Sequence, residues 1–261
     1  TPSGPAGYLL TFQDVTETRK REREARVQQR LAAVGEMAAG MAHEIRNPLA
    51  SMSGSIQVLR DELPLSSEQA QLMDIVLRES ERLNDTIKNF LAYARPQRST
   101  MQQLDLRRII EETGVLLRNS AEHADLHRID VEVPNEPVLF VGDEGQLRQI
   151  VWNLATNGLR AMNSSGTLTL SAAVERATGE PSREATAIIR VRDEGVGIPA
   201  EEVDRIFQPF KGTFTRGSGL GLSIVHRIVS DYAGRVDVLP APGGGTIVEV
   251  KLPGRVEVAS A

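Results

Sequence analysis

The sequence predicts an α+β protein with two domains: an antiparallel helical hairpin that dimerises into a four-helix bundle, followed by an α/β sandwich. In the first part of the chain apolar residues recur every three or four positions, which is the period of an amphipathic helix. From about residue 104 the period switches between 3.6 and two, which is typical of helices packed on a mixed sheet. The polar residues 96–100 separate the two patterns and predict a linker.

Composition excludes several function classes. The chain has 261 residues, 40% of them hydrophobic, and no cysteine, so it can bury one or two cores without disulfides, and any metal is expected on oxygen or histidine ligands. A net charge of −5 with both signs interspersed predicts no nucleic-acid partner. No apolar run approaches the roughly 18 residues of a membrane span, so we expect a cytoplasmic piece without membrane contact, although the full-length protein could be anchored upstream. Because Thr1 is no natural initiator, we expect a fragment of a longer protein.

Two long helices are expected in the first domain. One apolar stripe runs through about residues 16–61, which would be roughly 70 Å of helix and too long to stand alone in water. Pro64 marks a break, Ser66 with Gln69 has the pattern of a capping box, and the stripe resumes until Pro96. Because two helices leave each stripe half covered, the economical arrangement is a symmetric homodimer.

His43 is the first candidate for chemistry. It lies two residues from apolar positions on either side, about 200° around the helix from each, and is expected to project into solvent. A neutral imidazole can attack an electrophile through one nitrogen while Glu44 holds the other, and Asn47 is the neighbour one turn on. Pro48 is expected to kink the helix beside this site. The plain alternative is a solvated surface histidine.

Paired amides form the second candidate. Asn153 and Asn157 lie one turn apart on the helix expected after Asp143, and Arg160 follows another turn on. A carboxamide oxygen can enter the octahedral shell of Mg²⁺ beside phosphate oxygens, and an arginine can neutralise phosphate charge. The plain alternative is a helix with two solvated asparagines.

Glycine-rich turns supply the third candidate. Asp193 ends a strand and can accept a hydrogen bond from an exocyclic amine, while Gly195 and Gly197 let backbone approach a flat base. Thr246 follows a triple glycine that joins two strands, and its hydroxyl could assist base recognition. Both segments can also be read as ordinary turns.

A basic loop precedes the last helix. Phe207 and Phe210, in a chain with only 4% aromatic residues, are expected to pack as core at its base, and the loop itself, with Lys211 and Arg216, is expected to be mobile. It leads to a helix N-terminus whose free amides can bind phosphate. The residues there are Gly217, Gly219, Leu220 and Gly221. A dinucleotide fingerprint is excluded because no strand precedes these glycines, and the chain has no P-loop.

The order and spacing of these motifs resemble those of bacterial sensor histidine kinases. His43-Glu-Ile-Arg-Asn-Pro-Leu49 resembles the H box, and segments resembling the N, G1, F and G2 boxes follow in the family's order. The amino-acid sequence of the H box, and the short lid that precedes Gly217, resemble those of the NtrB/PilS-like subgroup. Residues 8–17 resemble the last strand and exit of a PAS sensor domain that feeds a signalling coiled coil.

This resemblance implies a phosphotransfer hairpin and a Bergerat-type (GHKL) sandwich that binds ATP and Mg²⁺. His43 is implied as the phosphoacceptor, Glu44 as the base that orients it, and Asn47 as the residue linked to dephosphorylation of the partner. The implied partner is the receiver domain of a response regulator, which takes the phosphoryl group on an aspartate.

In the sandwich, the resemblance implies that Asn157 is the Mg²⁺ ligand, that Asn153 and Arg160 lie on the phosphate side, and that Asp193 anchors adenine. The other implied ATP-binding residues are Gly195, Gly197, Lys211, Arg216, Gly217, Gly219, Leu220, Gly221 and Thr246. Gly158 departs from the family pattern, where alanine is commoner, and Arg160 stands where lysine or histidine is frequent.

The implied organisation divides the chain into six segments. These are residues 1–15, the last strand of a PAS-like domain; 16–29, a signalling coiled coil; 30–96, the dimerisation and phosphotransfer domain; 97–103, a linker; 104–255, the ATP-binding domain; and 256–261, a tail.

Two rival functions are weighed against a kinase. A GHKL-fold ATPase should carry a carboxylate where Asn153 stands and has no use for the H box. A catalytically silent dimeric scaffold is disfavoured by the intact Asn157 and Asp193. The sequence leaves open the input signal, the identity of the regulator, and whether His43 is phosphorylated in cis or in trans.

Overall fold

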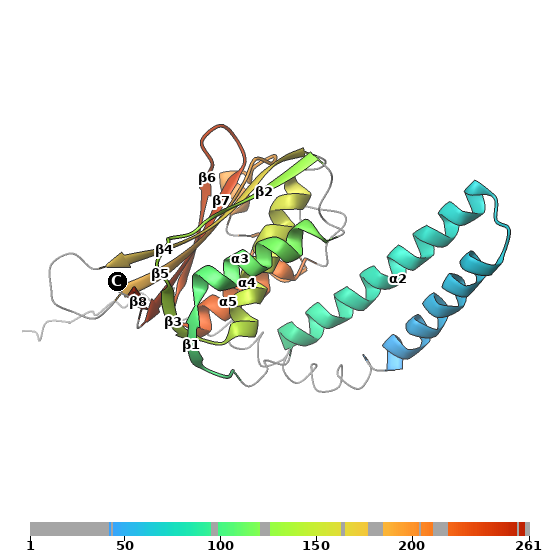
Figure 1. Ribbon diagram of the computed structural model, residues 1–261, viewed down its shortest axis with the longest axis horizontal. Helices are drawn as coiled ribbons and strands as arrows, with labels where there is room; N and C mark the ends of the chain where they lie inside the picture. The colour runs from blue at the N-terminus through green and yellow to red at the C-terminus, as the bar shows by residue number, and fades with distance from the viewer. Residues whose placement is uncertain are drawn as a thin grey trace, which may run out of the picture. The chain divides into compact units, whose positions relative to one another are not determined.

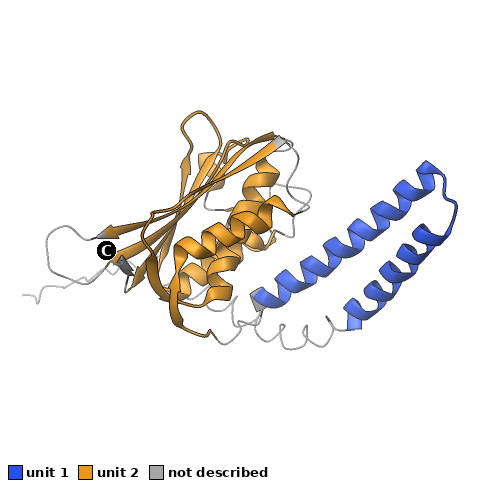
Figure 2. Cartoon of the chain, viewed as in Figure 1, with its two compact units in different colours: residues 1–95 blue, residues 96–261 orange. Residues whose placement is uncertain are grey.

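The computed structural model has two compact units, residues 1–95 and 96–261 (Figure 2). It describes residues 42, 44–94, 99–120, 126–162, 165–176, 185–203, 205–210, 219–254 and 256–258. The predicted PAS-like strand and coiled coil lie outside this part of the chain, as do His43, Lys211, Arg216 and Gly217. None of the described helices is both long and apolar enough to cross a membrane.

The first unit is a helical hairpin. Residues 44–62 are helical through Pro48, and α2 spans Ser67–Ala94. The predicted capping box is confirmed, because the Ser66 N–H donates to Gln69 Oε1 over 3.0 Å and the Gln69 N–H donates to Ser66 Oγ over 3.3 Å. These two bonds satisfy backbone donors at the start of α2 that would otherwise have no partner.

Polar contacts join the two helices in antiparallel order. Arg46 Nε donates to Asn84 Oδ1 over 3.2 Å, and Arg60 pairs with Asp74 over 3.1 Å nearer the turn. Because the residue later in the first helix pairs with the earlier residue of α2, the predicted antiparallel hairpin is confirmed.

Large apolar side chains of this unit remain exposed. Met52 is 52% exposed on the first helix and Leu72 is 59% exposed on α2. Others on the two helices are Ile45, Val58, Leu59, Ile75, Val76 and Leu83. One copy of the hairpin therefore leaves much of its apolar stripe uncovered.

The second unit is a sandwich of helices on a five-stranded sheet (Figure 1). The sheet order is β2-β4-β5-β7-β6, and its strands are β2 (Leu126–Glu132), β4 (Ser165–Arg176), β5 (Ala185–Asp193), β7 (Thr246–Gly254) and β6 (Arg235–Pro240). Among the described strands of this sheet only β2 and β4 pair in parallel, so the predicted mixed sheet is confirmed. The helices on one face of this sheet are α3 (Leu106–Arg118), α4 (Glu144–Ala161) and α5 (Gly221–Asp231).

A smaller antiparallel sheet lies beside the sandwich, in the order β1-β3-β8. Its strands are β1 (Gln102–Asp105), β3 (Val138–Gly142) and β8 (Val256–Val258). Residues 102–103 of β1 fall in the predicted linker, and all of β8 falls in the predicted tail. These two segments are too short to show a period, and they become strands because β3 offers both of its edges for pairing.

The core lies between the helices and the five-stranded sheet, and α4 runs through its middle, in contact with both α3 and α5. The largest fully buried side chains include Leu106, Ile110, Leu117, Phe140, Leu147, Ile150, Leu159, Leu168, Leu170, Ile189, Leu220 and Ile224. Those of α4 anchor the helix that carries the amide pair.

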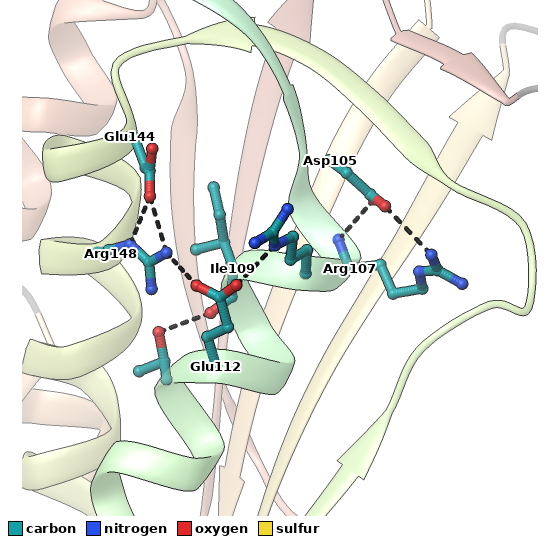
Figure 3. Close-up of polar contacts among 8 residues, drawn as sticks. Asp105, Arg107, Ile109, Glu112, Glu144 and Arg148 are labelled. Atoms are coloured by element: carbon teal, nitrogen blue, oxygen red, sulfur yellow. Dashed lines mark hydrogen bonds and ion pairs between the residues drawn. The ribbon is translucent and has the colours of Figure 1, made fainter.

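An ion-pair cluster joins α3 to α4 at the rim of this core (Figure 3). Arg148 of α4 donates to Glu112 of α3 and, over 2.7 Å, to Glu144 Oε1 on its own helix. Arg108 Nε donates to the other oxygen of Glu112 over 2.6 Å. The hydrogen bonds from Arg148 and Arg108 lower the pKa of the Glu112 carboxyl below its ordinary value.

We expect Glu112→Gln to lower the melting temperature at neutral pH by about 1–3 °C, since exposed ion pairs contribute about 0.2–1 kcal/mol. Because the folded-state pKa of Glu112 is lowered, its contribution is present above the pKa of the unfolded glutamate and is lost as the pH falls through the folded-state value. Melting curves from neutral to about pH 3 check this. Glu111→Gln on the same helix is the matched control, and a difference that persists unchanged in acid would contradict the assignment.

Candidate functional site

Asp193 is the buried acid at the centre of the candidate site. It is the last residue of β5 and is only 5% exposed. Its Oδ1 accepts hydrogen bonds from the Gly195 N–H over 2.9 Å and from the Thr246 N–H over 3.3 Å. Thr246, itself buried, is the Cα partner of Asp193 in the pairing of β5 with β7. The sheet therefore brings together two candidate segments that lie far apart in the sequence.

The electrostatics of Asp193 are set by its burial. Loss of water raises the pKa of the carboxyl above its ordinary value, and the hydrogen bonds from the Gly195 and Thr246 amides oppose that rise. Both bonds are made by Oδ1, which leaves Oδ2 as an acceptor for a group that enters the site. A buried acceptor of this kind can recognise an amine.

The turn after Asp193 is pressed against the end of α4. The Val196 N–H donates to the Ala161 carbonyl over 3.3 Å, and a Cβ at Gly195 would lie 2.7 Å from that same carbonyl oxygen. Gly197 follows with a φ of +75°. At Gly195 the backbone lies closer to the end of α4 than any side chain would permit. The expectation that Gly195 and Gly197 let the backbone approach a flat base stays a prediction.

Two further glycines allow close approach to Asp193. A Cβ at Gly158 of α4 would lie 2.7 Å from Leu168 Cδ1 and 3.2 Å from Asp193 Cβ. Gly245 has a φ of +92°, and a Cβ there would overlap the Asp193 carbonyl oxygen. Gly158, which departs from the family pattern, allows α4 to lie against Asp193 in this fold.

The predicted amide pair faces the start of α5. Asn153 is 9% exposed, and its Nδ2 has no hydrogen-bond partner among the described residues. Asn157 is half-buried one turn on, and a Cβ at Gly221 would lie 3.6 Å from Asn157 Nδ2 and 3.8 Å from Asn153 Cγ. The alternative of two solvated asparagines is therefore wrong for Asn153. A buried donor without a partner beside a helix N-terminus is complementary to a ligand with acceptor oxygens.

The base of the basic loop is closed by the backbone. The Phe210 N–H donates to the Gly219 carbonyl over 3.0 Å, so the two residues that flank 211–218 lie together. Leu220, which is fully buried, follows and anchors the start of α5. Phe207 packs on the His226 ring with centroids 5.5 Å apart.

The expectation that Phe210 packs as core is wrong. Its side chain is 60% exposed, and its backbone has a left-handed φ of +61°. Closing the loop uses its N–H, and in that conformation the ring points outward.

Arg160 lies in the last turn of α4 and is half-buried. The structure thus brings Asp193, Thr246, Asn153, Asn157, Gly221 and their neighbours together around α4.

Comparisons with known proteins agree with this arrangement. Residues 33–99 match the family described as the His Kinase A (phospho-acceptor) domain, and residues 142–256 match the histidine kinase-, DNA gyrase B- and HSP90-like ATPase family. A helical phospho-acceptor domain followed by an ATPase-type sandwich defines the catalytic core of a signalling kinase. The chain belongs to the bacterial sensor histidine kinases.

Named relatives and solved structures fall in the same family. The chain is 33% identical to sporulation kinase C of Bacillus subtilis (strain 168), over 95% of this chain and 57% of that protein, and 33% identical to the signal transduction histidine-protein kinase AtoS of Escherichia coli (strain K12), over 95% and 39%. Full-length ShkA in complex with AMPPNP superposes with a TM-score of 0.66 at 25% identity, covering 86% of this chain and 47% of that one. Histidine kinase ThkA in complex with the response regulator protein TrrA gives 0.60 at 27% identity, covering 93% and 68%. The chain therefore spans only about half the length of its curated relatives.

We expect Asp193→Asn to raise the melting temperature of the ligand-free protein at neutral pH by about 2–4 °C, or about 1 kcal/mol. The amide oxygen can keep both bonds that Oδ1 accepts, while the buried charge is removed. The folded-state pKa of Asp193 is raised, so folding favours the protonated carboxyl. The stability that Asp193 contributes is therefore fully present below the pKa of the unfolded aspartate and is lost as the pH rises through the folded-state pKa.

The difference between the two proteins should therefore shrink as the pH falls. Melting curves over a pH series, with Asp130→Asn on β2 as a control, measure it. A large loss of stability at neutral pH would show that the ionised carboxylate holds the turn together.

Proposed function

We propose that this chain is an ATP-dependent protein histidine kinase that phosphorylates its own His43 and passes the phosphoryl group to an aspartate in the receiver domain of a response regulator. The proposal is carried by two groups that lie around the same helix. One is a buried acceptor, the Asp193 carboxylate, and the other is the Asn153 amide, whose Nδ2 has no hydrogen-bond partner among the described residues. These groups are complementary to the two ends of ATP, the base and the phosphates.

A hydrogen-bond acceptor binds one end of the nucleotide and a hydrogen-bond donor binds the other. The free oxygen of Asp193 accepts from the adenine amine, and Asn153 Nδ2 donates to a phosphate oxygen. Asn157 offers a carboxamide oxygen to Mg²⁺, which neutralises phosphate charge when bound, and Arg160 adds a positive charge. The remaining residues that we assign to ATP are Gly195, Gly197, Lys211, Arg216, Gly217, Gly219, Leu220, Gly221 and Thr246.

In the kinase step, one imidazole nitrogen of His43 attacks the γ-phosphorus, an N–P bond forms, and the bond from that phosphorus to the bridging oxygen of ADP breaks. The proton on the other ring nitrogen is held by Glu44, which is exposed on the first described helix, residues 44–62. Asn47, also exposed, is assigned to dephosphorylation of the regulator, because its amide can orient a water toward an acyl phosphate.

A homodimer fits the hairpin best. Each copy exposes large apolar side chains such as Met52 and Leu72 on both helices. A second copy packed on the same faces covers them and produces a four-helix bundle. The predicted segment limits, the PAS-like start and the NtrB/PilS-like subgroup stay predictions.

Two observations favour a kinase over its rivals. Residues 33–99 match a phospho-acceptor family, for which an ATPase alone has no use. Asn153 is a buried amide, whereas an ATPase should carry a carboxylate at this position. A catalytically silent scaffold would have no need to keep the amide pair and the buried Asp193.

We expect His43→Gln to keep ATP binding and to abolish self-labelling with γ-labelled ATP and Mg²⁺, because an amide is a far weaker nucleophile than imidazole. The wild-type label should be acid-labile and base-stable, as a phosphoimidazole is. His123→Gln, which lacks the Asn/Pro context, is the matched control and should label normally. Substantial acid-labile label on His43→Gln would assign the acceptor to another histidine.

We expect Asn157→Ala to reduce self-labelling at limiting Mg²⁺–ATP by about tenfold or more, since the loss of a metal ligand costs on the order of 1.4 kcal/mol or more. The hairpin dimer, measured by light scattering, should be unchanged. Asn119→Ala removes an asparagine outside the amide pair and is the matched control. Labelling and nucleotide affinity equal to those of the wild type would rule out the metal assignment.

A further inference from the structure

Asp143 joins three parts of the second unit. Its Oδ1 accepts from the Gln146 N–H over 2.9 Å, which makes it the N-cap of α4. Its Oδ2 accepts from the Thr100 N–H over 2.7 Å. Its own N–H donates to Tyr232 Oη over 2.8 Å, at the C-cap of α5. One residue thus contacts the chain before β1, the start of α4 and the end of α5.

The contact with Thr100 is the unusual one. A helix cap requires a single acceptor oxygen, and serine or asparagine serves as well as aspartate at this position. The second oxygen of Asp143 instead holds an exposed backbone donor 43 positions earlier in the chain. Thr100 lies in the segment that follows the hairpin, just before β1 begins at Gln102. The chain that leaves the first unit is therefore fastened to α4 before it enters a sheet.

The two helices that Asp143 contacts also carry the nucleotide residues. Farther along α4 lie Asn153 and Asn157, and the first residue of α5, Gly221, faces both of them. Tyr232 follows the opposite end of α5. A displacement of Thr100 therefore acts at the start of one of these helices and, through Tyr232, at the end of the other.

We infer that Asp143 is a positioning residue that couples the linker to the nucleotide site, so that movement of the linker changes the rate of phosphoryl transfer. The inference rests on the proposed kinase function. Helices transmit such a displacement because they lie in a close-packed protein interior and move as rigid bodies. The Asp143–Thr100 hydrogen bond holds the linker in register with α4 and α5 during the reaction.

Two substitutions break this bond from opposite sides in the full chain. Asp143→Ser keeps an equally good cap but has one short hydroxyl, which cannot also reach Thr100. Thr100→Pro removes the backbone donor, whereas Thr100→Ala keeps it and is the matched control. The measurements are the melting temperature, the affinity for a non-hydrolysable ATP analogue, and the rate of self-labelling at saturating ATP.

Asp143→Ser and Thr100→Pro should each change the labelling rate in the same direction by about fivefold or more. The affinity for the ATP analogue should stay within about twofold of the wild type. The labelling rate of the double variant should differ from the wild-type rate by no more than that of the single variant with the larger effect. Thr100→Ala should behave as the wild type. Labelling at the wild-type rate in either variant, multiplicative effects in the double variant, or a parallel loss of analogue affinity would overturn the inference.

A second readout does not depend on catalysis. In hydrogen exchange, Thr100→Pro should reduce the protection of amides in α4 and α5 beyond the first turn of α4, and Thr100→Ala should not. Unchanged protection in Thr100→Pro would overturn the coupling even if the wild type failed to label itself. A wild-type chain without label would instead overturn the proposed kinase function.

Discussion

The candidate site depends on one buried carboxylate, that of Asp193. Removing a carboxylate from water is unfavourable, and here two backbone amides and the register of β5 with β7 hold it in place. Gly195, Gly158 and Gly245 leave the room that this arrangement needs against α4 and the neighbouring strand. A protein selected for stability alone would not retain such a charge, so its presence points to a ligand.

Helix α4 transmits the consequences of that constraint to the rest of the unit. Its C-terminal end is fixed by the Val196 N–H on the Ala161 carbonyl, and its N-terminal end by the Asp143 contacts. Between these ends the Arg148–Glu112 ion pair holds it to α3, and its amide pair faces α5. The residues that we propose for the phosphates and for the base are therefore positioned by a single helix.

Much of this arrangement follows from local patterns in the sequence. The capping residues Ser66 and Asp143 and the alternation along β5 and β7 are local signals, and each correctly predicts its element. What local patterns cannot predict depends on distant partners: β1 and β8 exist because β3 has two edges to offer, and Phe210 is exposed because its N–H closes a loop with Gly219. The contacts of Asp143 with Thr100 and Tyr232 join residues far apart in the chain and have no sequence signature.

We propose that Asp193 and α4 form an adenine-nucleotide site, and calorimetric titration of the chain with ATP and with GTP in the presence of Mg²⁺ tests this assignment most directly. Adenine presents an amine to the Asp193 carboxylate, whereas guanine presents a carbonyl oxygen that the carboxylate repels. We expect ATP to bind at least about tenfold more tightly than GTP, a difference of about 1.4 kcal/mol or more. No binding of ATP, or equal affinity for the two nucleotides, would contradict the account.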